Sequence, residues 1–209
     1  MSQTSHVMTT RKGELLQDPP FVQKILADRR AGWFWFILRI WLGWQWLSAS
    51  MHKITNPAWV SGGTALKGFW TSAIAIPESG SPAIHYAWYR SFLTFMLNAQ
   101  AYTWFAKLIA YGEFLIGIGL ILGAFTGIAA FFSGLMNWNF MMAGSASSNP
   151  MLFVIAVGLI LAWKVAGYVG ADYFLLSWLG TPWKTAKQEA LQDAGTVSNA
   201  PSSHPVSGD

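Results

Sequence analysis

The chain has 209 residues, enough for one domain or one compact membrane bundle. It is 53% hydrophobic and only 11% charged, unlike an ordinary soluble protein, and its net charge of +4 comes from scattered Lys and Arg residues rather than a nucleic-acid-binding patch. The chain has no cysteine, which excludes disulfides, thiol intermediates, cysteine-ligated iron–sulfur clusters and covalently attached haem.

Residues 1–30 form a polar leader that lacks the short apolar core and cleavage site of a signal peptide. The long apolar segments lie at about 33–51, 102–122, 125–142 and 151–168. Each is long enough to cross a hydrocarbon core of roughly 30 Å as a helix, and their continuous apolar character is unlike the alternation of barrel strands. The sequence predicts an all-α class, with an integral membrane four-helix bundle over residues 31–183.

The charge pattern also predicts an orientation. The cationic leader places the N-terminus in the cytoplasm, and four crossings return the C-terminus to the same side. Residues 184–209 are polar and rich in Ser, Ala and Pro, and we expect this tail to be disordered. The expected partner of the bundle is the lipid bilayer, and no nucleic acid is expected.

The connections between the apolar segments differ in length. Residues 123–127 predict a tight turn and residues 144–150 a short outer loop, so the last three helices should pack as antiparallel neighbours. Residues 52–101 are much longer than a connector and rich in aromatic side chains. This outer segment has two interpretations: one or two short helices that form a lid, with helical character over 83–97, or a loop resting on lipid headgroups. A short amphipathic helix is expected at 172–179.

Glu113 lies inside the second apolar segment, where a carboxylate needs a partner, a proton or a function. Arg39 lies about six residues into the first segment and Glu113 about nine residues from the cytoplasmic end of the second, so both are at similar depth. We therefore predict a buried Arg39–Glu113 pair. It would either lock two helices together or take part in catalysis through Glu113, unless Arg39 extends to the membrane interface instead.

Several cations are expected near the outer surface. The group contains His52, Lys53, Lys67, His85, Arg90 and Lys107. Together they would form a cationic mouth suited to a small anion, whereas singly each would anchor the chain to headgroups. His52 and His85 are the only histidines placed to pair, and no supporting ligand pattern accompanies them, so no metal or haem site is predicted.

The spans also contain two asparagines and a repeat of glycines. Asn137 and Asn139 flank Trp138 in the outer part of the third span, where Asn side chains usually bond to another helix, although Asn137 is also a candidate ligand contact. Gly119, Gly123 and Gly127 recur every four residues and predict close helix packing.

Six short segments together resemble the DoxX/DoxD membrane family. They are RIWLGW at 39–44, HK at 52–53, NPAW at 56–59, YGEFLIG at 111–117, GAFTG at 123–127 and MNWNFMMAG at 136–144, closing with NP at 149–150. The resemblance covers roughly residues 30–180. It implies a four-helix protein of a bacterial or archaeal cell membrane, similar to the large subunit of thiosulfate:quinone oxidoreductase, which works with a second, smaller subunit.

The resemblance implies a quinone as cofactor. Thiosulfate would be drawn to His52, Lys53 and Arg90, the quinone ring would stack on Trp70 or Trp88, and Glu113 would carry the quinone's protons. The first hypothesis is therefore a membrane subunit of a quinone-linked oxidoreductase. The alternative is a non-catalytic accessory subunit of a larger membrane complex, docked through the aromatic outer segment and the polar termini.

Overall fold

The computed structural model describes residues 8–9, 15–16 and 18–178. Apart from one antiparallel ladder of two-residue strands, β1 (Met8–Thr9) and β2 (Leu15–Leu16), the described residues form helices joined by loops. The helices before residue 100 are α1 (Pro20–Leu26), the 3₁₀ helix η1 (Arg29–Ala31), α2 (Gly32–Ile54), α3 (Pro57–Val60), α4 (Thr64–Ile74) and α5 (Ala87–Asn98). Those after it are α6 (Tyr102–Leu122), α7 (Thr126–Met142), α8 (Asn149–Leu161), α9 (Trp163–Tyr168) and α10 (Asp172–Trp178). The prediction of an all-α class is confirmed, and the tail expected at 184–209 lies outside the described residues.

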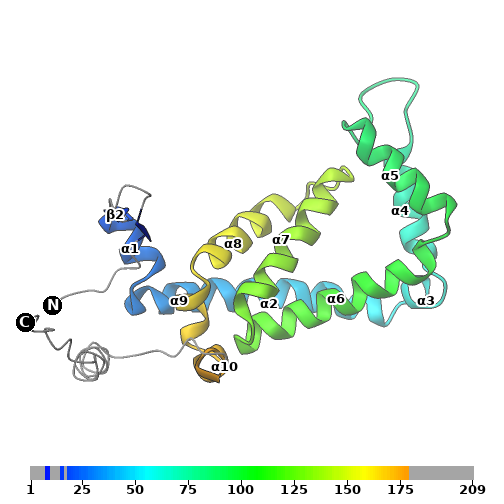
Figure 1. Cartoon of the computed structure of the whole chain (residues 1–209). Coiled ribbons are helices and arrows are strands. Elements are labelled where there is room, and N and C mark those ends of the chain that lie inside the picture. The colour runs from blue at the N-terminus through cyan, green and yellow to red at the C-terminus, as the bar shows by residue number, and fades with distance from the viewer. Residues whose placement is uncertain (1–7, 10–14, 17, 179–209) are drawn as a thin grey trace, which may run out of the picture.

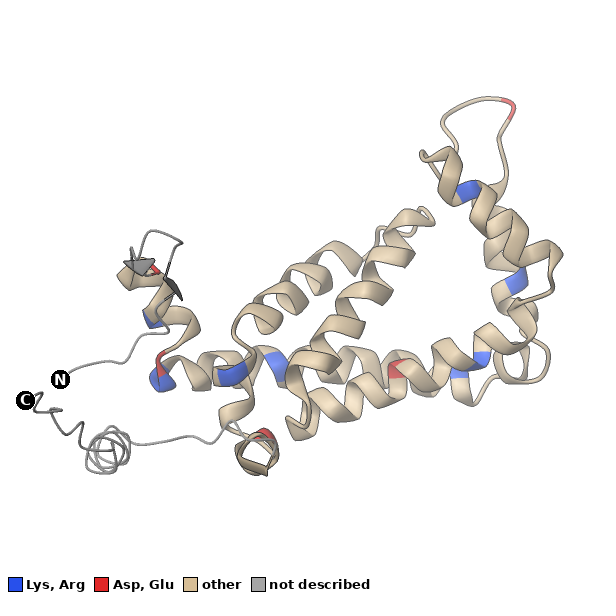
Figure 2. Ribbon diagram, viewed as in Figure 1, with Lys and Arg blue, Asp and Glu red and all other residues tan. Residues whose placement is uncertain are grey.

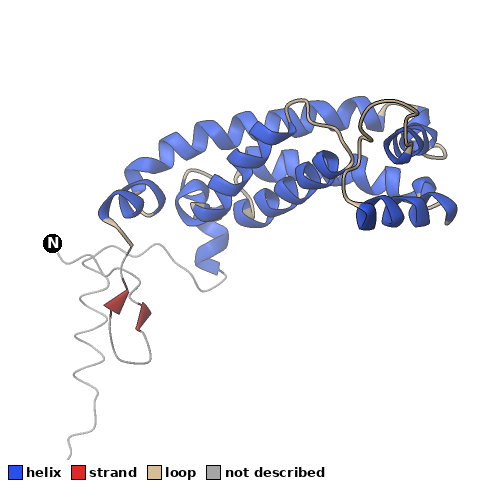
Figure 3. Ribbon diagram, turned by 90° about the horizontal axis from the view of Figure 1, so that it is seen from above, coloured by secondary structure: helices blue, strands red, loops and turns tan. Residues whose placement is uncertain are grey.

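The two longest helices, α2 and α6, run antiparallel along one side of the molecule, and the antiparallel pair α7 and α8 packs across them (Figure 1). Helices α4 and α5 project at one end, while α1, α9 and α10 lie toward the opposite end (Figure 1). Turned by 90°, the helices form an elongated body with the short strands outside it (Figure 3). We call the two extremities the α5 end and the α10 end.

The short connections follow from their residues. Gly123 ends α6 in the left-handed conformation that glycine adopts without steric cost, so α7 turns back at once. The apolar run expected at 151–168 is not one helix, because α8 ends at Leu161 and the chain restarts as α9 after Ala162. The long outer segment contains α3, α4 and α5, so it is partly helical as predicted, and α5 begins at Ala87 rather than at residue 83.

Two apolar clusters fill the interior. The first is formed mainly by α2, α6, α7 and α8, with fully buried residues such as Leu42, Leu120 and Leu159. The second lies at the α5 end around Trp70, Tyr89 and Leu93, and Met136 packs against both clusters. Within α2, Arg39, Gly43, Trp46 and Ser50 are buried.

Fewer helices than predicted are both long enough and apolar enough to cross a membrane. Among the described helices, α6 is the one that is long and apolar enough to cross a membrane, and α8 is apolar but shorter. Helix α2 has the length, but its tryptophans, Arg39 and polar residues lower its apolar character. Helix α7 has 17 residues, at the lower limit of a spanning helix.

Candidate functional site

The centre of the candidate site is an ion pair between α2 and α6. Lys53 Nζ lies 2.6 Å from both carboxylate oxygens of Glu113 and donates to each. The Glu113 side chain is 0% exposed and that of Lys53 18% exposed. The same ammonium lies 5.1 Å from the centre of the Trp59 ring and 5.7 Å from that of Phe140, so aromatic faces also stabilise its charge.

The register of α2 and α6 explains this pairing. At Gly43 and Gly117 the two backbones nearly touch: a Cβ on Gly117 would lie 2.8 Å from the Leu47 amide nitrogen. This approach sets Glu113 level with about residue 49 of α2. Helical side chains lean toward the N-terminus of their helix, so Lys53, one turn further along, reaches back to the carboxylate.

The ion pair lines a cavity of about 270 Å³. Its walls come from α2, α6, α7, α8 and the loop before α8, and the full lining is Gln45, Trp46, Ala49, Lys53, Glu113, Phe140, Ser145, Ser147, Ser148, Asn149 and Leu152. One side of the cavity is therefore charged, another aromatic, and the loop contributes hydroxyl and amide groups. Such a lining can bind a small ring and hydrogen-bond its oxygens.

The predicted Arg39–Glu113 pair is wrong. Arg39 is level with Gly123, because a Cβ on that glycine would overlap the guanidinium. Glu113 is ten residues away from Gly123 along α6, or roughly 15 Å at the helical rise. The prediction counted the depths of Arg39 and Glu113 from the cytoplasmic ends of their spans, and these ends are not level. Helix α2 begins seven residues before Arg39, whereas α6 ends at the level of Arg39 itself.

Arg39 instead binds the chain near the α10 end. It is 1% exposed, so it does not extend to the surface, and it donates from Nη1 to the Ala166 carbonyl at 3.0 Å and from Nη2 to the Val169 carbonyl at 2.7 Å. The nearby Asp172 carboxylate accepts from the backbone amides of Phe125 and Thr126 at 2.6 and 2.8 Å. Arg39 therefore fastens the chain after α8 to α2, and Asp172 fastens it to the α6–α7 turn, which makes Arg39 a structural residue in this arrangement.

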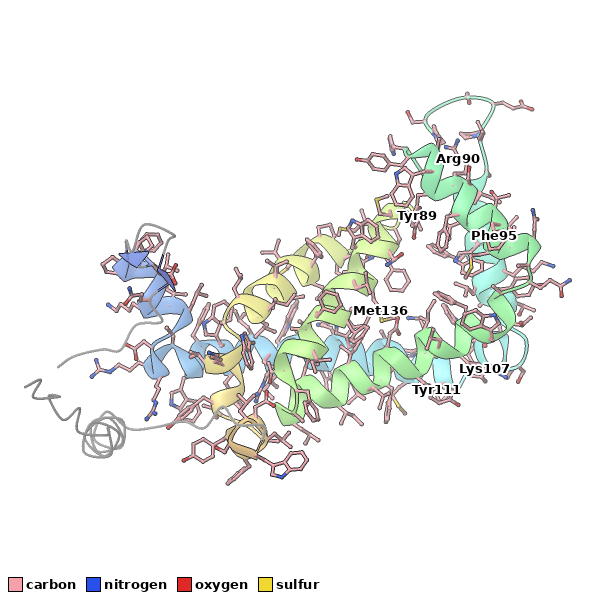
Figure 4. The ribbon with its side chains drawn as sticks, viewed as in Figure 1. Tyr89, Arg90, Phe95, Lys107, Tyr111 and Met136 are labelled. Carbon is pink, nitrogen blue, oxygen red and sulfur yellow. The ribbon has the colours of Figure 1, made fainter. Side chains whose placement is uncertain are left out.

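The expected cationic mouth does not form around the ion pair. Lys53 is bound to Glu113, and Arg90 in α5 donates to the Ile84 carbonyl in the loop that precedes this helix. His52, Lys67, His85 and Lys107 are exposed. Arg90 lies near the far tip of α5, whereas Lys107 lies on α6 near the base of the projecting helices (Figure 4).

The two tryptophans expected to stack on a quinone lie away from the ion pair. Trp70 is 4% exposed and packs against Phe105, with 5.8 Å between ring centres, so it belongs to the second apolar cluster. Trp88 is exposed and stacks on Trp138 at 6.5 Å. The aromatic rings near the ion pair are Trp46, Trp59 and Phe140 instead.

A second hollow of about 350 Å³ lies at the α5 end and is lined by Ala83, His85, Tyr86, Met141 and Met142. It is larger than the first cavity, but its lining holds no charged pair. We take the smaller cavity as the candidate site because a buried ion pair faces it.

Sequence reasoning identified Glu113 and Lys53 separately but not as partners. It also missed Gln45 and the Ser145–Asn149 loop as cavity lining and Asp172 as a cap. A usable signal existed for the pair: Gly43 and Gly117 fix the crossing point of two antiparallel helices, and counting outward from it brings Glu113 within reach of Lys53.

Among the described residues, no group of three or more His, Asp or Glu side chains is placed to hold a metal ion. Comparison of the chain with protein-family models, with curated proteins and with solved structures gives no match.

Proposed function

We propose that the chain is a multi-pass membrane protein, with α2, α6, α7 and the α8–α9 pair crossing the bilayer and both termini in the cytoplasm. The support is the outward face of these helices, which exposes large apolar side chains along its length, among them Trp44, Leu115, Phe131 and Val154. Helices α7 and α8 carry no charged residue (Figure 2). A soluble monomer rarely exposes so much contiguous apolar surface.

Within that membrane protein, we propose a quinone-binding subunit of an oxidoreductase. The observation that carries the proposal is the Lys53–Glu113 pair facing the 270 Å³ cavity. A quinone carbonyl needs a hydrogen-bond donor, which Lys53, Gln45 or Asn149 supplies, and its reduction needs protons, which a carboxylate such as Glu113 can pass. The cavity is slightly smaller than the roughly 300 Å³ of drug-sized pockets, which suits a single ring.

The charge of the pair favours this ligand over an anion. Because the ammonium and the carboxylate neutralise each other, the site offers a small dianion little net attraction and a nearby carboxylate that repels it. We therefore propose that the electron donor is oxidised elsewhere, on a partner subunit. For thiosulfate the balance is complete: two thiosulfates joining as tetrathionate release two electrons, and the quinone takes these with two protons to become a quinol.

The test is binding by the purified full-length protein in mild detergent. We expect a short-chain benzoquinone to bind with one site per chain and to quench tryptophan fluorescence, since Trp46 lines the cavity. Replacing Glu113 by Gln should weaken binding about tenfold or more, whereas Glu78→Gln, in an exposed loop, should leave it unchanged. Equal binding by all three proteins would exclude the site.

Orientation is tested separately with single cysteines, because the chain has none of its own. Ser147→Cys, in the exposed loop between α7 and α8, should react with a membrane-impermeant maleimide added outside intact cells. A cysteine replacing Ser2 should react only after the cells are opened. The reverse pattern would overturn the orientation.

A non-catalytic accessory subunit is the second candidate, favoured by the aromatic surface of α5. Tyr86, Trp88, Phe92 and Phe95 are all exposed, outside the four long helices. If this surface docks a larger complex, a fixed set of partner subunits will copurify, and Phe95→Ser with Phe92→Ser will release them without affecting quinone binding.

A further inference from the structure

Asn137, in α7, carries an unusual buried amide. It is 0% exposed, and neither Nδ2 nor Oδ1 has a hydrogen-bond partner among the described residues. An amide buried without partners destabilises a fold, and an apolar residue of the same size would avoid the penalty. Such a residue is typical of a site that trades stability for binding.

The neighbours of Asn137 on the same helix face locate the amide. Ser133, one turn toward the α10 end, accepts from Trp46 Nε1 at 2.7 Å. Phe140, about one turn in the other direction, lies over the Lys53 ammonium and lines the cavity. Asn137 therefore faces α2 between Trp46 and Lys53, roughly one helical turn from Phe140 in the cavity wall.

An apolar layer follows Ser133 and separates it from the buried Arg39 and Asp172 at the α10 end. Leu42, Leu120, Ala130 and Leu159 are 0% exposed and close this interior toward the α10 end. Polar groups therefore run from the Ser145–Asn149 loop through the ion pair and stop at Asn137 and Ser133. Asn137 lies near the inner limit of this polar stretch.

We infer that Asn137 is a ligand-binding residue that holds a ring oxygen of the bound quinone at this inner limit, an inference that rests on the quinone-binding function proposed above. Nδ2 donates to the carbonyl oxygen of a quinone, and Oδ1 accepts the hydroxyl proton of a quinol. A single amide thus binds both redox states, while Glu113 and Lys53 at the cavity serve the proton transfer.

The experiment compares wild type with Asn137→Leu, which keeps the side-chain size and removes both polar atoms. Binding of a short-chain benzoquinone and of its quinol is measured by fluorescence quenching, and stability by thermal unfolding in the same detergent. We expect Asn137→Leu to lose about tenfold in affinity for both forms and to gain about 3 °C in Tm. If Asn137 were only structural, Asn137→Leu would lose stability and keep the wild-type affinity. That result would overturn the inference.

Two further variants sharpen the comparison. Asn139→Leu is the matched control, because that amide already donates to the Leu135 carbonyl and accepts from Tyr89; it should lose stability and retain affinity. Asn137→Ser keeps a hydrogen-bond donor and an acceptor and should retain part of the affinity for quinone. This variant also tests the inference if Asn137→Leu fails to fold. If wild type binds and Glu113→Gln does not, but Asn137→Leu binds normally, only this inference fails. If wild type binds no quinone, the proposed function fails with it.

Discussion

Lys53 donates to both carboxylate oxygens of Glu113, and the two partners differ in their access to water. Glu113 is 0% exposed on the interior face of α6, whereas Lys53 is 18% exposed at the end of α2. The ammonium can therefore reach solvent by moving its flexible stem, and the carboxylate cannot. The loss of Lys53 and the loss of Glu113 should therefore lower the stability of the fold by different amounts.

The first prediction concerns that inequality. Lys53→Met leaves a fully buried carboxylate unpaired and should lower the free energy of unfolding by about 3–5 kcal/mol. Glu113→Gln leaves an ammonium that can turn to water, and should cost about 1–2 kcal/mol. Thermal or denaturant unfolding of the purified variants measures both changes.

The double variant Lys53→Met with Glu113→Gln provides the control. Because it leaves no unpaired charge, it should be more stable than Lys53→Met alone. Additive losses from the two substitutions would contradict a direct pair.

A second prediction follows from the close approach of α2 and α6. Gly117→Ala places a methyl group 2.8 Å from the Leu47 backbone nitrogen, so the helices must separate, and we expect a loss of about 1–3 kcal/mol. Gly112→Ala is the matched control on the same helix, since nothing lies within 4 Å of its added Cβ. It should be neutral or stabilise the helix by about 0.5–1 kcal/mol. Equal effects of the two would mean that α2 and α6 cross elsewhere.

The bounds of some helices could be predicted from the sequence, and those of others could not. Helix α6 matches its predicted bounds of 102–122, because a continuous apolar run ends at a glycine that adopts the left-handed conformation. The break at Ala162 gave no signal, since apolar residues continue on both sides of it and no proline marks it. Periodicity reports which face is buried, and it does not report where a buried helix of uniform composition stops.

The contacts of the site were less predictable for another reason. Arg39 binds the carbonyls of Ala166 and Val169, and backbone acceptors are present at every residue, so no side-chain pattern identifies them. The Lys53–Glu113 pair depends on the relative register of two helices, which hydropathy does not fix. Arg39 and Glu113 were correctly predicted to be buried, but finding their partners required the three-dimensional arrangement.

The third prediction tests the structural role of Asp172. Its carboxylate caps the first turn of α7 through Phe125 and Thr126, where the helix dipole favours a negative charge. Asp172→Ala should therefore cost about 2–4 kcal/mol of stability, and Asp172→Asn somewhat less. Asp28→Ala removes a comparable cap from the short helix η1 at the surface and should cost under about 1 kcal/mol. A loss for Asp28→Ala as large as that for Asp172→Ala would mean that burial does not set the strength of the cap.

The last prediction is a pH dependence carried by Tyr89, in α5. Burial raises the pKa of its phenol to about 12, above the value near 10 of an unfolded tyrosine, because the charged phenolate loses hydration. The neutral hydroxyl donates to the Asn139 carbonyl at 3.0 Å. Since the folded state holds the proton more tightly, Tyr89 stabilises the fold fully below pH 10, and this contribution is lost as the pH rises from 10 toward 12. Unfolding measured over that range should show a steeper loss for wild type than for Tyr89→Phe, and Tyr86→Phe, an exposed ring, should follow wild type. Parallel curves for wild type and Tyr89→Phe would show that the buried phenol does not account for the alkaline loss of stability.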